Sequence, residues 1–136
     1  MRMSVTDFLI TNWFLSVPFF LLVFLYFRDF AKRGGQRISV HEVTSLIDQG
    51  AQIVDLRTSE DFENGHITGS KNIPSIDIEK RSNEISSYKP LILICALGQN
   101  SPNAGEKLQA QGFKDIYILS GGIQMWADTG LPLVKD

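Results

Sequence analysis

The only cysteine of the chain, Cys95, opens a loop whose surroundings favour an anion. The apolar run 91–94 precedes it, and a helix is predicted over 102–111, with Ser101 as its N-cap and Gly112 as its stop. Unpaired N–H groups and the positive end of a helix dipole stabilise negative charge. The sequence therefore predicts a reactive thiolate or persulfide that solvent can reach. A buried structural cysteine is the alternative interpretation.

Cysteine count and charge exclude several classes of protein. A single cysteine cannot form an intramolecular disulfide, which indicates a reducing compartment. Residues 1–37 carry five Lys or Arg against two Asp or Glu, and residues 38–136 carry eight against thirteen. The larger part is therefore acidic, and we expect no nucleic-acid partner. Two distant histidines and one cysteine form no metal-binding pattern, so we expect neither a metal nor another cofactor.

An uncharged apolar segment over 8–27 predicts a membrane anchor. A helix of twenty residues, at about 1.5 Å per residue, spans roughly the 30 Å hydrocarbon core of a bilayer. Asn12 beside Trp13 fits the membrane interface, and Pro18 is tolerated in a spanning helix. A cleaved signal peptide is the alternative. The length of the apolar core and the lack of a small-residue cleavage site after it favour the anchor.

Positive charge after the apolar segment predicts its orientation. One basic residue precedes the segment and four follow it: Arg2, then Arg28, Lys32, Arg33 and Arg37. The positive-inside rule then places the C-terminal side in the cytoplasm, in agreement with the reducing compartment. We expect 1–37 to be the anchor with its basic linker, in which Gly34-Gly35 is a flexible hinge, and 38–136 to be the domain.

Alternating helix and strand signals predict an α/β domain with a mainly parallel central sheet. The predicted strands cover 52–57, 91–94 and 115–119, and the predicted helices begin near Ser39, Thr58 and Ser101. A capping box at Ser39 and Glu42 supports the first of these helices, whereas 76–85 is ambiguous and is interpreted as helical. Ligands usually bind at the carboxyl ends of parallel strands, where Arg57 and Cys95 both lie.

Three separated blocks of sequence resemble the rhodanese family of sulfurtransferases. They are Val54-Asp-Leu-Arg57 with 65–74, then Cys95-x-x-Gly98, and finally 121–126 with Gly130-Leu-Pro132. The blocks extend over nearly all of 38–134, and the resemblance implies the rhodanese-like three-layer fold. With its apolar N-terminal segment, the chain resembles the small membrane-anchored single-domain rhodaneses of bacteria, the YibN type. That resemblance implies a single-pass protein of the cell inner membrane with a cytoplasmic domain.

The resemblance also implies a covalent mechanism. Cys95 would accept sulfane sulfur from a donor as a persulfide and pass it to a thiol or protein acceptor, which for an anchored enzyme includes a membrane protein. The N–H groups that would hold the persulfide belong to Ala96, Leu97, Gly98, Gln99, Asn100 and Ser101. A related phosphatase branch has one residue more between its cysteine and arginine. Ser101 stands where that arginine would fall, so phosphatase activity is not expected.

The loop departs from the family at Asn100, where the sulfurtransferases usually have arginine. Loss of one charge-assisted contact costs about 1.5–3 kcal/mol. We therefore expect thiosulfate to bind about ten- to a hundredfold more weakly, while persulfide storage on the backbone is unaffected. The alternative hypothesis, from a different class, is a catalytically idle rhodanese fold that serves as a membrane-tethered protein-binding module.

Three further residues have both a functional and a structural interpretation. Arg57 is a candidate substrate-binding residue, although an ion pair with Glu60 or Asp61 that fixes the following turn is the simpler expectation. His66 is interpreted as structural, because a thiolate beside a helix N-terminus requires no base. Trp126 is expected to pack the last helix against the sheet, with a place at the rim of the site as the alternative. His41 is expected at the surface.

Overall fold

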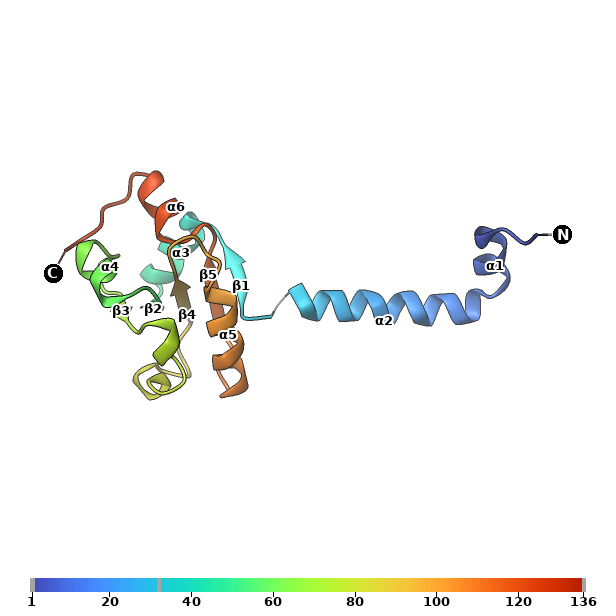
Figure 1. Ribbon diagram of the computed structural model, residues 1–136, viewed down its shortest axis with the longest axis horizontal. Helices are drawn as coiled ribbons and strands as arrows, with labels where there is room; N and C mark the ends of the chain where they lie inside the picture. The colour runs from blue at the N-terminus through green and yellow to red at the C-terminus, as the bar shows by residue number, and fades with distance from the viewer. Residues whose placement is uncertain (1, 32, 136) are drawn as a thin grey trace. The chain divides into compact units, whose positions relative to one another are not determined.

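The computed structural model describes residues 2–31 and 33–135. The chain divides into two compact units, Met1–Lys32 and Arg33–Asp136, and each is described by itself (Figure 1).

The first unit contains two helices, α1 (Val5–Thr11) and α2 (Trp13–Ala31). Ser4 begins α1 with a capping box to Asp7. The chain breaks between the helices at Asn12, whose Nδ2 donates to the carbonyl oxygen of Phe8 at 2.9 Å. Ser16 Oγ in turn donates to the carbonyl oxygen of Asn12 at 3.2 Å. The prediction of one continuous helix over 8–27 is therefore wrong at Asn12, where the side-chain amide competes for a helical carbonyl oxygen.

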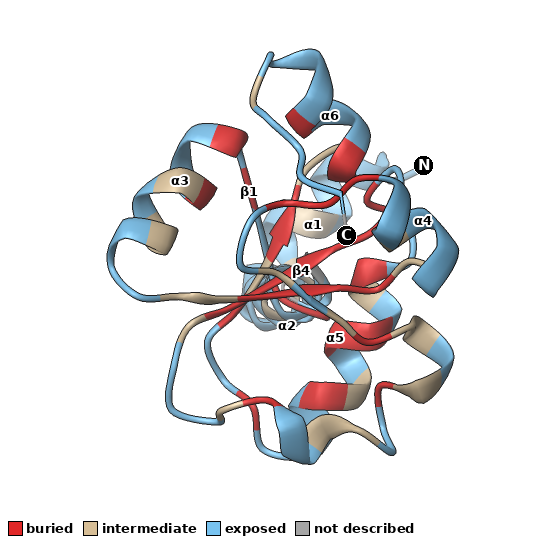
Figure 2. Ribbon diagram, turned by 90° about the vertical axis from the view of Figure 1, so that its left-hand side faces the viewer, coloured by how far each residue is buried: buried red, intermediate tan, exposed pale blue. Residues whose placement is uncertain are grey.

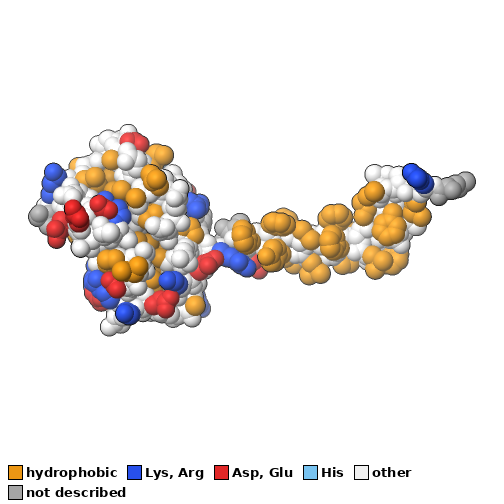
Figure 3. Space-filling model, viewed as in Figure 1, with side chains coloured by type: hydrophobic (Ala, Val, Ile, Leu, Met, Phe, Trp, Pro, Cys, Tyr) orange, Lys and Arg blue, Asp and Glu red, His pale blue; other side chains and the backbone are white. Residues whose placement is uncertain are grey.

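Helix α2 has the length and composition of a membrane span. Its most apolar window, Trp13–Phe30, has a mean hydropathy of 1.5, and none of it is buried. Hydrophobic side chains extend along this unit (Figure 3). The core helix of a soluble protein meets the same test of length and composition, but such a helix is mostly buried. A signal sequence near an N-terminus meets the same test of length and composition.

The second unit is built on five parallel strands. They are β1 (Gln36–Ile38), β2 (Gln52–Asp55), β3 (Lys71–Asn72), β4 (Leu91–Ile94) and β5 (Ile116–Leu119), in the order β1-β5-β4-β2-β3. The central strand β4 reads Leu-Ile-Leu-Ile and is buried throughout, as expected for a parallel strand covered on both faces. The α/β fold with a parallel central sheet is thus confirmed.

The sheet forms the middle of three layers, and a hydrophobic cluster lies between it and the segments that cover each of its two faces (Figure 2). Helices α3 (Val40–Asp48) and α6 (Gly122–Asp128) pack on one face through Val43, Ile123 and Trp126. Helix α5 (Ser101–Ala110) packs on the other through Ala104 and Leu108. That second face is completed by the segment with the 3-10 turns η1 (Ser75–Asp77) and η2 (Ser82–Glu84). The short helix α4 (Ser59–Asn64) follows β2.

The structure confirms the predicted capping box at Ser39 and Glu42, but not the predicted helix over 76–85. Ser39 Oγ accepts from the backbone N–H of Glu42, and the Glu42 carboxylate accepts from that of Ser39 at 2.7 Å, so the box is confirmed. The interpretation of 76–85 as one helix is wrong, since only the two 3-10 turns form. Ile78 and Ile85 are buried in the same hydrophobic cluster as Ala104 and Leu108 of α5, and this tertiary packing replaces the repeating helical face.

The Gly34-Gly35 pair is not a flexible hinge. Both glycines are buried, and the backbone N–H of Gly34 donates to Gln109 Oε1 of α5 at 3.0 Å. A Cβ placed on Gly105 would overlap the carbonyl oxygen of Gly34, so two glycines let the backbone lie directly on α5. The residues just after them form β1, which pairs with β5. The predicted linker therefore belongs to the domain from Arg33 onward.

Candidate functional site

Cys95 lies immediately after β4, at the carboxyl edge of the sheet. Side chains alternate along a strand. Leu91 and Leu93 therefore belong with Cys95 to the cluster under α5, while Ile92 and Ile94 belong to the opposite cluster. The cysteine is only 3% exposed. The expectation of a solvent-reachable thiol is therefore wrong for this conformation, because the alternation that orients β4 also turns Cys95 into the core.

The N-terminus of α6 fixes the first two peptides of the cysteine loop. The backbone N–H of Ile123 donates to the carbonyl oxygen of Cys95 at 2.8 Å, and that of Gln124 to the carbonyl oxygen of Ala96 at 3.3 Å. In a trans peptide the N–H points opposite to the C=O. The N–H groups of Ala96 and Leu97 therefore point away from α6, toward the face of the sheet that holds the Cys95 side chain.

Six consecutive N–H groups of the loop, residues 96–101, remain available. None of them donates to an acceptor within 2–31 or 33–135. Gly98, with φ of +81°, turns the loop back on itself, and its carbonyl oxygen lies 3.5 Å from Arg37 Nη1. A run of unpaired amides beside a glycine in the left-handed region is an arrangement that binds anions. The backbone N–H groups of the loop can therefore bind a negatively charged sulfur.

Helix α5 begins one residue earlier than predicted. Asn100 is the N-cap, with a right-handed helical backbone and no side-chain cap bond, and Pro102 follows within the first turn. Ser101 was expected as the cap, but it is the first helical residue, and its side chain is fully buried rather than turned back onto the helix. The predicted helix end is close, because α5 stops at Ala110 before Gly112. The positive end of the helix dipole thus meets the loop directly.

Arg57 is bound to Asp55 and not to Glu60 or Asp61. Its Nε lies 3.0 Å from Asp55 Oδ1, and its Nη2 lies 2.9 Å from Oδ2, a bidentate pair. The same Nη2 donates to the carbonyl oxygen of Gly65 at 2.6 Å. The Asp55 carboxylate is 1% exposed, so the guanidinium compensates a buried charge. The expected turn-fixing role is therefore present, but with another partner.

His66 and Trp126 both have structural contacts. The His66 ring is 5% exposed, stacks on Phe62 at 3.8 Å between ring centroids, and its Nδ1 lies 2.7 Å from the carbonyl oxygen of Phe62. Trp126 is 6% exposed and packs α6 on the sheet, as predicted, with its Nε1 donating to the carbonyl oxygen of Pro132 at 3.2 Å. The histidine at position 41 is exposed, also as predicted.

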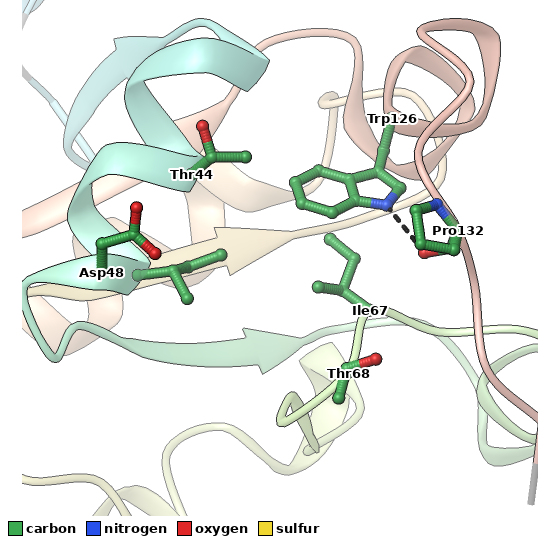
Figure 4. A pocket seen from close by; sticks show the side chains of 7 residues that line it. Thr44, Asp48, Ile67, Thr68, Trp126 and Pro132 are labelled. Atoms are coloured by element: carbon green, nitrogen blue, oxygen red, sulfur yellow. Dashed lines mark hydrogen bonds between the residues drawn. The ribbon is translucent and has the colours of Figure 1, made fainter.

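Two hollows lie on opposite faces of the domain. One, of about 200 Å³, is mainly apolar and is bounded by Thr44, Ile47, Asp48, Ile67, Thr68, Trp126 and Pro132 (Figure 4). It is on the face of α3 and α6, away from the Cys95 side chain. The other, of about 180 Å³, is more polar and adjoins the loop through Asn100, with Ser75, Asn103 and Lys107. Small polar reactants fit the second hollow better.

The glycines at 121 and 122 belong to the third block of the family resemblance, but no role was predicted for them from the sequence. Both have positive φ, and a Cβ on Gly122 would overlap the carbonyl oxygens of Cys95 and Ala96. This close approach is what lets α6 bind the loop. The signal available in the sequence was the pair of adjacent glycines. Glycine is the residue that permits a left-handed backbone and a close approach of two backbone segments.

A five-stranded parallel sheet with a cysteine loop at the end of its central strand defines an α/β domain of the rhodanese-like fold. The chain belongs to the rhodanese-like domain family, whose model matches residues 39–129. It is 36% identical to the thiosulfate sulfurtransferase GlpE of Pseudomonas aeruginosa over 91 residues, which are 67% of this chain and 83% of that protein. It is also 41% identical to YqhL of Bacillus subtilis over 76 residues, or 56% of this chain and 60% of that protein. A rhodanese-related protein of Thermoplasma volcanium superposes with a TM-score of 0.69 at 29% identity, covering 74% of this chain and 99% of that one.

Proposed function

We propose that this protein is a membrane-anchored sulfurtransferase that carries sulfane sulfur as a persulfide on Cys95. The observation that carries the proposal is the row of six unpaired amides, residues 96–101, at the carboxyl edge of the parallel sheet. Membership of the rhodanese-like family and similarity to proteins named thiosulfate sulfurtransferase support the same activity.

The reaction consists of two displacements at sulfur. The Cys95 thiolate attacks the outer sulfur of thiosulfate, a new S–S bond forms, and sulfite leaves with the electron pair of the broken S–S bond. The product is the anion Cys95–S–S⁻. A thiolate acceptor or cyanide then attacks the outer sulfur, and the Cys95 thiolate leaves. Ala96, Leu97, Gly98, Gln99, Asn100 and Ser101 provide the N–H groups that stabilise the persulfide anion.

Burial of Cys95 shapes the chemistry that the site favours. Its 3% exposure separates the sulfur from bulk water, which strengthens each amide contact to an anion. The exposed loop residues Leu97, Gln99 and Asn100 surround the approach to it. Because Asn100 is neutral, we propose that thiol-bound sulfur is exchanged more readily than thiosulfate, whose charged end loses the arginine contact. Arg57 contributes by holding Asp55 at the same edge.

The anchor forms part of the proposal. Helix α2 would cross the bacterial inner membrane once and leave the domain in the cytoplasm, because positive charge is concentrated after the span. The domain would then meet donors and acceptors at the membrane surface, including membrane proteins. Attachment of green fluorescent protein or alkaline phosphatase to the C-terminus tests this orientation. Fluorescence without phosphatase activity is expected, and the reverse contradicts it.

Intact-mass measurement tests the sulfur chemistry. The full-length protein in detergent is exposed to thiosulfate or to a low-molecular-weight persulfide. An adduct of about 32 Da is expected, since one sulfur atom is added. It must disappear with cyanide and be absent from Cys95→Ser. Failure of both donors to give the adduct contradicts the proposal and favours the tethered protein-binding module.

A second experiment tests the role given to Asn100. Asn100→Arg restores the charge and the two-pronged donor, so KM for thiosulfate is expected to fall about ten- to a hundredfold. Exchange with a neutral persulfide donor should change little. Asn103→Arg, at another exposed position of the same hollow, is the matched control for added charge. Equal KM values for Asn100→Arg and the wild type would refute the assignment.

A further inference from the structure

The Ser101 hydroxyl is an unpaired polar group in the interior of the domain. The residue is 0% exposed, and Oγ finds no hydrogen-bond partner among the described residues. Buried hydroxyls without partners are uncommon in folded proteins because they lose their bonds to water. One other buried hydroxyl in the described residues, Ser86 Oγ, is unpaired in the same way.

The place of Ser101 in the fold relates this hydroxyl to the sulfur site. Ser101 begins the buried face of α5, which continues through Ala104, Gly105 and Leu108. Cys95 belongs to the same cluster as Ala104 and Leu108, so both ends of the six-residue loop turn into one layer of the domain. Ser86, by contrast, bonds Gln52 at the amino end of β2, the opposite edge of the sheet.

The resting thiol does not use the Ser101 hydroxyl, since no hydrogen bond joins it to Cys95. A persulfide differs from the thiol by one more sulfur atom, about 2 Å beyond Sγ at the usual S–S length. That atom carries the negative charge and would lie between the cysteine and the first turn of α5. An anionic acceptor at this point would satisfy both the unpaired hydroxyl and the unpaired amides.

We infer that Ser101 Oγ donates a hydrogen bond to the outer sulfur of the Cys95 persulfide and so stabilises the loaded protein over the empty one. The inference rests on the proposed function. It gives the site a side-chain donor in addition to its backbone amides, and this donor acts on the product of the first displacement rather than on the attacking thiolate. Ser101 is thereby a determinant of how much sulfur the protein retains.

The experiment compares Ser101→Ala, Ser101→Thr and the matched control Ser86→Ala with the wild type, all as full-length protein in detergent. Each is equilibrated with thiosulfate and sulfite, and intact mass gives the ratio of loaded to empty protein. Ser101→Ala is expected to lower the loading equilibrium constant about tenfold or more, the effect of one hydrogen bond to a charged group. Ser101→Thr, which keeps the hydroxyl, and Ser86→Ala should stay within about twofold of the wild type, a difference below 0.5 kcal/mol in loading free energy.

Alkylation of the empty thiol by iodoacetamide provides a second readout. Its rate should be the same in Ser101→Ala and the wild type, because the hydroxyl does not contact the resting sulfur. Equal loading of Ser101→Ala and Ser86→Ala would overturn the inference while leaving the proposed function intact. Absence of loading in the wild type would instead overturn the proposed function. If Ser101→Ala melts at a lower temperature, the loading of Ser101→Thr decides, and a tenfold loss there also overturns the inference.

Discussion

At the scale of single residues, Gly122 tests how the cysteine loop is held. Its φ is +61°, and an added Cβ would overlap the carbonyl oxygens that accept from Ile123 and Gln124. Gly122→Ala is therefore expected to displace the loop and abolish persulfide loading, as measured by intact mass. Unfolding in urea should show a loss above the 1–2 kcal/mol that a left-handed alanine costs by itself, about 3 kcal/mol in all.

Gly50→Ala is the control for that prediction. Gly50 also has a positive φ, of +92°, but no atom lies within 4 Å of an added Cβ. Gly50→Ala should therefore lower the free energy of unfolding only by the strain of a left-handed alanine, about 1 kcal/mol, and should load sulfur normally. If Gly122→Ala loads sulfur as well as Gly50→Ala does, the contact between α6 and the loop does not position the amides.

Arg57 carries the second residue-scale prediction. Removal of its guanidinium leaves the Asp55 carboxylate, 1% exposed, without its cation. Arg57→Ala should lower the free energy of unfolding by about 3–5 kcal/mol, measured by urea titration. KM for thiosulfate, measured at a temperature where the variant is folded, should be unchanged. Arg57→Lys keeps the charge but not the bidentate geometry, and we expect an intermediate loss of stability.

A KM for thiosulfate raised tenfold with unchanged stability would contradict this prediction. It would return Arg57 to the substrate-binding role that the sequence also allowed. The sequence placed Cys95 and Arg57 at the same edge, because strand ends are visible as apolar runs followed by polar residues. It did not identify Asp55 as the partner of Arg57, since a pairing two residues apart depends on how the chain turns after β2.

At the scale of elements, Glu84 joins β3 to η2 through two cations. Its Oε1 lies 2.9 Å from Lys71 Nζ, and its Oε2 lies 2.6 Å from Arg81 Nε. Hydrogen bonds from Arg81 and then Lys71 lower the pKa of Glu84 from 4.5 to about 2. The folded state therefore binds the proton more weakly than the unfolded state, and the stabilisation is present above about pH 4.5 and is lost as the pH falls toward 2.

Glu84→Gln tests this linkage. The wild type should be more stable than the variant at pH 7, by a small amount because the group is partly exposed, and the difference should shrink when urea unfolding is repeated at pH 4 and pH 3. Glu63→Gln removes an exposed glutamate that has no ion pair in the described part of the chain, and it is the control for the loss of one surface carboxylate. A difference for Glu84→Gln that is constant from pH 7 to pH 3 would contradict the assignment.

The elements that sequence reasoning missed share a physical cause. Capped helices such as α3, and apolar strands such as β4, carry their signal locally and were predicted. The strand β1 did not, because Gln36 and Arg37 are polar and exposed and only pairing with β5 makes them a strand. The segment with the 3-10 turns η1 and η2 likewise depends on burial of Ile78 and Ile85 in the cluster that includes Ala104 and Leu108 of α5. The conformation of these segments is determined by tertiary contacts, and such contacts cannot be recognised in a single sequence.

At the scale of the whole chain, the predictions that depended on composition and on the order of helices and strands were the strongest. An apolar N-terminal segment and an alternating α/β pattern were visible without any structure, and so was the lone cysteine at a strand end. The boundary between the two units was not, because the basic stretch 32–37 has the composition of a linker. Contact of Gly34 with Gly105 and Gln109 instead makes the end of this stretch part of the domain. Glycine pairs permit close packing as well as flexibility, and sequence alone does not separate the two.

Two truncations test this boundary. A chain that starts at Arg33 retains the docked glycines and β1, so it should fold, lose its membrane attachment and load sulfur. A chain that starts at Ser39 loses β1, the edge strand that pairs with β5, and also loses Ile38, which is 4% exposed. Burial of that one side chain contributes about 2 kcal/mol, so the shorter chain should melt at least about 8 °C lower.

Thermal unfolding followed by circular dichroism measures the difference between the two truncations, and sedimentation of cell membranes measures their attachment. Gly105→Ala in the chain that starts at Arg33 provides an independent check, because its Cβ would push Gly34 from α5 without shortening the chain. It should melt between the two truncations, despite the higher helix propensity of alanine. Equal melting temperatures for the chains that start at Arg33 and Ser39 would mean that β1 and the glycines only rest on the domain, and that 33–38 is the linker its composition suggests.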